Sequence, residues 1–200
     1  LHAGATNNPK KRPSVVILHD GKPGVAWTSD TGGGVTTSGV FFMRCINTCT
    51  SAPSTNWGGV GGTANGTPDT ILNSGANAVF QSALAQMPGP SASGSSTRDL
   101  YVFFSQSAGT ALKYSIASCV SCGATPPTWS WGAVPTLDGS TVTAGRYNYL
   151  NTTMDSRFER VGIAWASADS TYCASVAYCL VSKFVNKNGA SSTANVINSN

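Results

Sequence analysis

The sequence predicts an all-β protein built from small antiparallel sheets. Short apolar and aromatic runs alternate with turns rich in Gly, Ser, Thr, Asn and Pro, which is the composition of strands and tight turns. Only 10% of the 200 residues are charged, and Glu159 is the only glutamate. The chain is therefore poor in the residues that favour surface helices, yet long enough to bury a substantial core.

The stretch from Asp99 to Trp131 shows the pattern most clearly. Leu100 to Phe104 is an apolar and aromatic run typical of a buried strand. After a turn, residues 111–117 mix apolar and polar side chains as a second strand would. A cysteine pair and two prolines then end that strand, and two tryptophans begin a short third one.

The same layout occurs once upstream and once downstream. Two kinds of landmark give its spacing: the aromatic residues Trp27, Phe104 and Trp165 are 77 and 61 residues apart, and the cysteines Cys45, Cys119 and Cys179 are 74 and 60 residues apart. Because the two landmarks give nearly the same intervals, they indicate one unit that occurs three times with loops of different length.

Each unit is expected to be a meander of four strands. In the first unit we expect strands at 14–18, 24–28, 39–45 and 56–61, then a loop over 62–75. In the second unit, residues 76–87 could form a helix by propensity, but the repeat favours a strand. An insertion at 88–97 follows, then the strands described above, with the fourth at 129–134, and Leu137-Asp138-Gly139 as a turn.

The third unit is expected to begin with strands at 145–150 and 161–165. Its third strand should start at Ala174, pass through Cys179 and end near Phe184. Only Val196 and Ile197 are available for a fourth strand. This unit is therefore the least complete of the three.

A four-stranded meander repeated every 60–77 residues is typical of β-propeller blades. We predict a polar arm at residues 1–12 and one propeller-type domain over 13–200, with blades at about 13–75, 76–144 and 145–200. The three landmark aromatic residues should fill the space between blades. Since propellers close with about four to eight blades, three blades leave a partial ring. A longer chain or a second copy, giving six blades, would complete it.

The six cysteines form three local pairs, Cys45/Cys49, Cys119/Cys122 and Cys173/Cys179. An even count in a Ser/Thr-rich chain favours disulfides and an oxidising compartment, so we expect a secreted or cell-surface protein. Zinc is the rival interpretation at 119–122, but it needs four ligands, and both histidines are far away in the sequence. For the third pair to bond, Cys173 must lie in a turn and fold back; otherwise one of the two has another partner.

The net charge of +4 is mild, and no basic stripe interleaved with aromatic residues suggests nucleic-acid binding. No apolar run approaches the roughly 18–20 residues of a membrane span. The chain begins at Leu1 without a visible leader, as a processed or partial chain would. We expect no cofactor and no metal, because Asp20-Gly21 and Asp138-Gly139 are ordinary turn pairs.

One known family resembles this chain. The residues that carry the resemblance are Asp20 to Trp27, reading D-G-K-P-G-V-A-W, and Leu112-Lys113-Tyr114, in the order strand, turn, strand, cysteine pair, tryptophan. This order is similar to the repeats of secreted bacterial sialidase-like propellers of the BNR type. The resemblance extends from Pro13 to Phe184 and implies the fold far more strongly than any activity.

The resemblance also implies where a ligand would bind. Sialidases hold a substrate carboxylate with clustered arginines and use a Tyr/Glu nucleophile with an Asp acid/base. Arg12 lies at the matching place before the first strand, and Arg146 and Tyr147 could converge with it. However, Glu159 follows its strand on the wrong side of the turn, and Ser29-Asp30-Thr31-Gly32 lacks the tryptophan of an Asp-box.

Three classes of function remain open. The leading hypothesis is an extracellular, non-catalytic recognition or scaffold module that binds a carbohydrate or a protein near Arg12, Arg146 and Tyr147. A sialidase-like glycoside hydrolase is the first alternative, and a structural subunit of a surface assembly or filament is the second. Self-association would serve either the ring or the filament. The chain has no G-x-S-x-G, H-E-x-x-H, Walker or dinucleotide motif.

Overall fold

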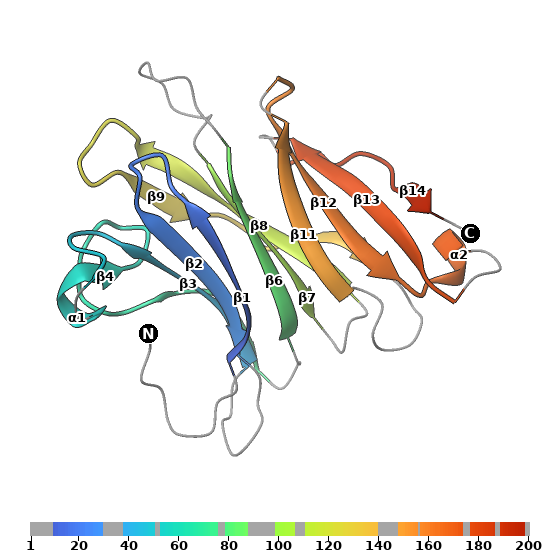
Figure 1. Cartoon of the computed structure of the whole chain (residues 1–200), viewed down its shortest axis with the longest axis horizontal. Coiled ribbons are helices and arrows are strands. Elements are labelled where there is room, and N and C mark those ends of the chain that lie inside the picture. Colours follow the sequence, from blue (N-terminus) through green and yellow to red (C-terminus); the bar gives the residue numbers. More distant parts are fainter. Residues whose placement is uncertain are drawn as a thin grey trace.

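The computed structural model of the chain describes residues 10–29, 38–50, 53–75, 79–87, 99–106, 111–139, 148–155, 157–173, 177–186 and 189–198. Its described part is all-β, with three antiparallel sheets of four or five strands and two one-turn helices. The sheets follow one another along the chain, and none of them is closed (Figure 1). The all-β prediction is therefore confirmed.

Five strands make up the first sheet: β1 (Lys10–Ile17), β2 (Pro23–Ser29), β3 (Ser38–Cys45), β4 (Trp57–Gly58) and β5 (Asp69–Gly75). Helix α1 (Pro53–Asn56) leads directly into β4. Both β4 and β5 pair with β3, at opposite ends of that strand. The outermost position of this sheet is therefore shared by two short strands.

The second sheet repeats this arrangement with β6 (Val79–Gln86), β7 (Leu100–Gln106), β8 (Ala111–Ser121), β9 (Thr128–Trp131) and β10 (Thr136–Gly139). Here β9 and β10 share the long strand β8. The third sheet has four strands, β11 (Asn148–Asp155), β12 (Arg160–Ser167), β13 (Cys179–Asn186) and β14 (Asn195–Asn198), with helix α2 (Ser170–Cys173) between β12 and β13.

The first strands of the three sheets lie side by side. Strand β6 contacts β1 on one side and β11 on the other (Figure 1). Polar groups join them: the backbone N–H of Leu84 donates to Oγ of Ser14 at 2.9 Å, and Thr152 Oγ1 donates to the carbonyl oxygen of Leu84 at 3.1 Å. The sheets are therefore stacked in chain order with the same edge gathered together.

The two faces of each sheet are named by their direction along the stack. The N-side face is directed toward the first-sheet end of the stack, and the C-side face is directed toward the third-sheet end. Strand alternation assigns every side chain to one of them. The C-side face of the first sheet packs on the N-side face of the second, through Leu18, Ala26, Val40, Phe42 and Val60 against Leu84, Leu100, Val102, Phe104, Ala117 and Trp129. Two stacked faces thus form one apolar layer.

The second and third sheets form another layer of the same kind. Ala83, Tyr101, Phe103, Leu112 and Tyr114 on the C-side face of the second sheet meet Val161, Ile163, Trp165, Val181 and Val185 on the N-side face of the third. Consequently β7 is buried along its whole length, as its uninterrupted apolar run predicts. Phe104 and Trp165 lie between sheets as expected, whereas Trp27 lies on the outward N-side face of the first sheet.

Two of the predicted loops and turns are strands. Residues 69–75, predicted as part of a loop, form β5, and residues 136–139, predicted to contain a turn, form β10. The strand predicted at 56–61 is limited to the two residues of β4, and the one predicted at 129–134 corresponds to β9. Polar residues dominate these edge segments, so their pairing depends on the neighbouring strand and leaves little apolar alternation in the sequence.

The third strand of the third sheet begins later than predicted. The prediction had this strand begin at Ala174. Residues 174–176 lie outside the described residues, residues 177 and 178 are not in a strand, and β13 starts at Cys179. Cys179 thus lies at the start of its strand, whereas Cys45 ends β3 and Cys119 lies near the end of β8. The cysteine landmark of the third unit was therefore wrong, although the spacing of the aromatic landmark fits the strands. The strand predicted at 76–87 is confirmed over Val79–Gln86, while residues 76–78 lie outside the described residues, and the strand predicted at Val196 and Ile197 is confirmed.

All three predicted disulfides are present, with Cα–Cα distances of 5.5 Å for Cys45–Cys49, 5.7 Å for Cys119–Cys122 and 5.2 Å for Cys173–Cys179. Cys173 lies in α2, in the turn between β12 and β13, and folds back to meet Cys179. Of the two possibilities open for this pair, the turn is the one observed. The first two bridges close the ends of third strands, and the third closes a different corner.

Candidate functional site

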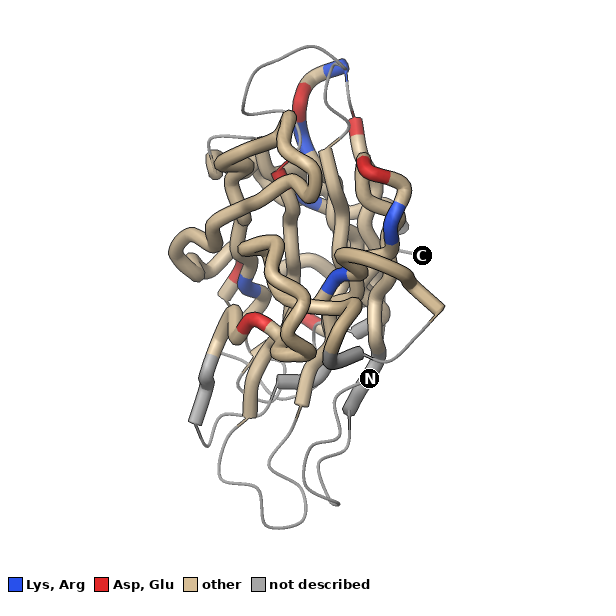
Figure 2. The backbone as a smooth tube through the Cα atoms, turned by 90° about the vertical axis from the view of Figure 1, so that its left-hand side faces the viewer, with Lys and Arg blue, Asp and Glu red and all other residues tan. Residues whose placement is uncertain are grey.

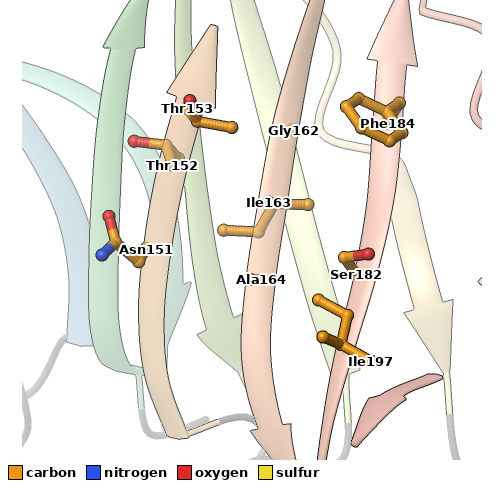
Figure 3. A pocket seen from close by; sticks show the side chains of 9 residues that line it. All are labelled: Asn151, Thr152, Thr153, Gly162, Ile163, Ala164, Ser182, Phe184 and Ile197. Carbon is orange, nitrogen blue, oxygen red and sulfur yellow. The ribbon is translucent and has the colours of Figure 1, made fainter. Parts of the chain in front are cut away.

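The best candidate for a binding site is a groove on the C-side face of the third sheet, with a volume of about 520 Å³. Figure 3 shows how it is built: β11 supplies Asn151 and Thr153, β12 supplies Gly162 and Ala164, and β13 supplies Ser182 and Phe184. Ile197 of β14 borders it, while Thr152 and Ile163 contribute to its floor. The groove is therefore a surface of three adjacent strands and one edge strand.

Strand register explains why these side chains share a face. Thr153 lies opposite Gly162, which lies opposite Phe184, and Asn151, Ala164 and Ser182 form the next such row. Directly opposed residues in antiparallel strands point to the same side of the sheet. On the other side, Ile163 belongs to the core and Thr152 donates to Leu84.

The depth of the groove comes from the small residues of β12. A Cβ atom placed on Gly162 would lie 3.0 Å from Cγ2 of Thr153 and 3.1 Å from Cε1 of Phe184. The ring of Phe184 thus leans over the glycine, and Ala164 adds only a methyl group. A larger side chain at either position would fill the groove from below.

Among the described residues, the charged side chains beside the groove lie at one end of it. The guanidinium of Arg160 lies 4.1 Å from the ring centroid of Phe184 and 4.8 Å from that of Phe158, and it pairs with Asp155 at 2.9 Å. Cation–π contacts of this kind hold the arginine and the ring together. The lining itself carries no ionisable side chain, so the groove offers uncharged hydrogen-bonding groups and apolar surface.

Charged residues are sparse over the rest of the described chain as well, as the mostly tan tube of Figure 2 shows. In the part of the chain that the structure describes, two ionic contacts have a buried member. Arg44 is fully buried, 3.5 Å from the Asp20 carboxylate and stacked 4.9 Å from the ring centroid of Trp129. Burial lowers the pKa of Arg44, and the carboxylate of Asp20 opposes that shift.

The second buried contact joins the second and third sheets. Lys183 Nζ and the Tyr172 hydroxyl both donate to Oδ1 of Asp138, each at 2.7 Å. Burial raises the pKa of Tyr172, and its hydrogen bond to the carboxylate of Asp138 raises it further. Asp138 thus accepts from both groups where the second and third sheets pack, so this cluster stabilises the contact between the two sheets.

The predicted ligand residues cannot be placed against this groove. Arg146 and Tyr147 lie outside the described residues, and Arg12 is described only by its backbone in β1. Their convergence therefore stays a prediction. Within the described residues, no three His, Cys, Asp or Glu side chains are grouped so as to hold a metal, and neither short helix could cross a membrane.

A scan of protein-family models finds no match to this sequence, and a search of the curated proteins finds none either. The groove was missed in the sequence because its residues look like ordinary strand residues. One signal was available: in β12 the small residues Gly162, Ala164 and Ala166 alternate with the large Val161, Ile163 and Trp165. Such a strand buries one face and leaves a hollow on the other.

Proposed function

We propose that the chain is an extracellular, non-catalytic scaffold and recognition module of the β-propeller type, and that its C-side groove is a protein-binding surface. The stacking of three consecutive sheets with their first strands side by side supports the propeller interpretation. Three disulfides support an oxidising, extracellular compartment.

The observation that carries the proposal is the chemistry of the groove. Its lining combines uncharged side chains, Asn151, Thr153 and Ser182, with apolar ones, Phe184 and Ile197. Protein interfaces use this mixture of apolar contact and neutral hydrogen bonding. With no acid or base in its lining, the groove is suited to binding and not to proton transfer.

Site-specific crosslinking tests this function. A photoreactive benzophenone amino acid replaces Asn151, which is exposed in the groove, in cells that produce and secrete the protein. We expect ultraviolet light to join the chain to a protein, seen as a heavier band and identified by mass spectrometry. The matched control carries the same amino acid at Val120, which is 67% exposed on the second sheet, and should give no such band.

A carbohydrate ligand is the second candidate, favoured by one feature. The Phe184 ring and the Ser182 hydroxyl on β13 lie across the groove from the Asn151 amide on β11, a combination that could contact a sugar ring and its hydroxyls. A glycan array separates the two candidates. Glycan binding that Asn151→Arg abolishes, together with no protein adduct at position 151, would replace the protein ligand with a carbohydrate.

A further inference from the structure

We propose that the partner of the C-side groove is a second copy of this chain, which covers the groove with the N-side face of its first sheet. This inference rests on the proposed function, because it names the partner of the same surface. Two copies would each contribute three sheets and close together into a ring of six, with two identical head-to-tail interfaces.

The first step of the argument is that the groove repeats a face that is already covered. On the C-side face of the first sheet, Gly24 and Ala26 precede Phe42, whose ring atoms lie 3.2 Å from where a Cβ of Gly24 would be. On the third sheet, Gly162 and Ala164 have the same spacing, and the ring of Phe184 likewise lies close to the glycine; Phe184 is directly opposite Gly162, whereas Phe42 is directly opposite Ala26. Phe42 is fully buried under the second sheet, whereas Phe184 is only half-buried.

The second step identifies what covers such a face. The second sheet covers Phe42 with its N-side face, where Phe104 and Trp129 are prominent and the Trp131 ring lies 5.5 Å from that of Phe42. A sheet with the same N-side face would therefore fit the open groove.

The third step locates that face on this chain. On the N-side face of the first sheet, Trp27 corresponds to Phe104, because each is the fifth residue of its second strand. Trp57 corresponds to Trp129, because each lies opposite the first cysteine of a disulfide, Trp57 across from Cys45 and Trp129 across from Cys119. The first sheet thus has an aromatic pair, Trp27 and Trp57, at the positions of Phe104 and Trp129; in the single chain Trp27 is buried and Trp57 is half-buried.

Part of the N-side face of the first sheet is exposed to solvent in the single chain. Val25, Trp27 and Met43 are buried there, but Val15 and Ile17 of β1 are 58% and 66% exposed. Leu84, on the N-side face of the neighbouring first strand β6, is only 2% exposed because the first sheet covers it. A copy whose β11 lay beside β1, as β6 does within the chain, would bury both residues.

The test uses two single variants of the full chain, one on each face. Asn151→Arg places a charge in the groove, and Val15→Glu places one on the exposed part of the N-side face. Both positions are exposed, so folding should be retained, which circular dichroism and intact disulfides would verify. Light scattering after gel filtration should give wild type a mass twice that of the 20.5 kDa chain, and each variant the mass of one chain.

Mixing the two variants is the decisive step. In a mixed head-to-tail pair, one interface joins the unaltered groove of Val15→Glu to the unaltered N-side face of Asn151→Arg, and the other carries both substitutions, whose charges are opposite. Because one interface is fully unaltered, the mixture should recover the mass of a dimer. Val120→Glu, on the second sheet, should stay dimeric by itself and serves as the matched control.

Several results would overturn the inference. Wild type that remains a monomer at concentrations of about 100 µM, or variants that still dimerise, would show that another partner covers the groove. A dimer that mixing cannot restore would indicate an interface made by the same patch twice, and long polymers would rule out the closed pair. A monomer that crosslinks through position 151 to a different protein would overturn the second copy and leave the proposed function standing.

Discussion

Lys183 Nζ lies 2.7 Å from Oδ1 of Asp138, and this ion pair joins the third sheet to the second. Asp138 is buried and Lys183 is largely covered, with 7% and 13% of their side-chain surfaces exposed. Removing one member of a buried pair leaves the other charge without compensation, which typically costs about 3 kcal/mol or more. We expect Lys183→Met to lower the free energy of unfolding in urea by about that amount. Lys113→Met, on β8 of the second sheet, is the matched control and should change it by less than about 0.5 kcal/mol.

Trp165 should be among the most sensitive apolar residues of the chain. It is fully buried between the second and third sheets. Truncating a buried tryptophan removes its burial energy and leaves a cavity, so Trp165→Ala should lower the free energy of unfolding by about 3–5 kcal/mol. Tyr149→Ala, in the same sheet, removes a side chain that is 74% exposed. Equal losses for the two variants would contradict the packing described.

Arg44 and Asp20 should respond unequally to substitution. No hydrogen bond to Nε, Nη1 or Nη2 of Arg44 is present within the described residues, and the Asp20 carboxylate is its ion-pair partner. Asp20→Asn would leave a buried guanidinium without compensation, whereas Arg44→Met would leave a carboxylate that is 17% exposed and can reach water. In denaturant titrations at pH 7, Asp20→Asn should therefore be the more destabilising variant. The opposite order would show that the pair is not held by the charge of Asp20.

Alkaline pH should weaken the contact between the second and third sheets. Burial and the hydrogen bond to Asp138 raise the pKa of Tyr172 above its ordinary value, so the folded chain keeps this proton when the unfolded chain has lost it. The resulting stability is complete below about pH 10, where the unfolded tyrosine is protonated, and it is lost as the pH rises further.

Urea titrations between pH 8 and 11 test this contribution. Wild type should lose stability more steeply above about pH 10 than Tyr172→Phe, which has no proton to lose. Burial also raises the pKa values of Tyr101 and Tyr114, so some loss should persist in the variant. Identical slopes would show that Tyr172 is accessible to water in the folded state.

The third disulfide should stabilise the corner between β12 and β13. A bridge that closes a loop as short as that between Cys173 and Cys179 contributes about 2 kcal/mol in the chain-entropy description. Replacing both residues by alanine should lower the urea midpoint while the other two bridges stay intact, which mass spectrometry of alkylated thiols would show. An unchanged midpoint would mean that packing alone fixes this corner.

Much of the fold could be predicted because burial leaves a clear pattern in sequence. The continuous apolar run of β7 correctly indicated a strand that is covered on both faces. The aromatic landmarks Trp27, Phe104 and Trp165 lie in the second strands of the three sheets. Residues 79–86 are rich in helix formers, yet they form β6 because β7 supplies backbone pairing and the neighbouring sheets supply burial. Tertiary context outweighs local propensity in such a case.

The errors have physical causes too. Strands β5 and β10 are held by backbone pairing to β3 and β8, which leaves little side-chain pattern. Cys179 matched the expected interval although it lies at the other end of its strand, because the spacing of cysteines alone does not indicate where a strand begins and ends. The groove depends on the ring of Phe184 on β13 lying over Gly162 on β12. This contact depends on how the two strands pair, so it could not be predicted from the sequence of either strand alone.

The complete burial of β7 has a consequence for how the chain could be shortened. Its even-numbered side chains pack on the first sheet and its odd-numbered side chains pack on the third. Both faces of the second sheet are therefore covered by other sheets along this strand. Truncating the protein after residue 139 would lay bare Tyr101 and Phe103 together with Leu112 and Tyr114, and such a fragment should precipitate or recruit a substitute cover. Engineering with this scaffold therefore has to add or remove terminal sheets along with a matching cap.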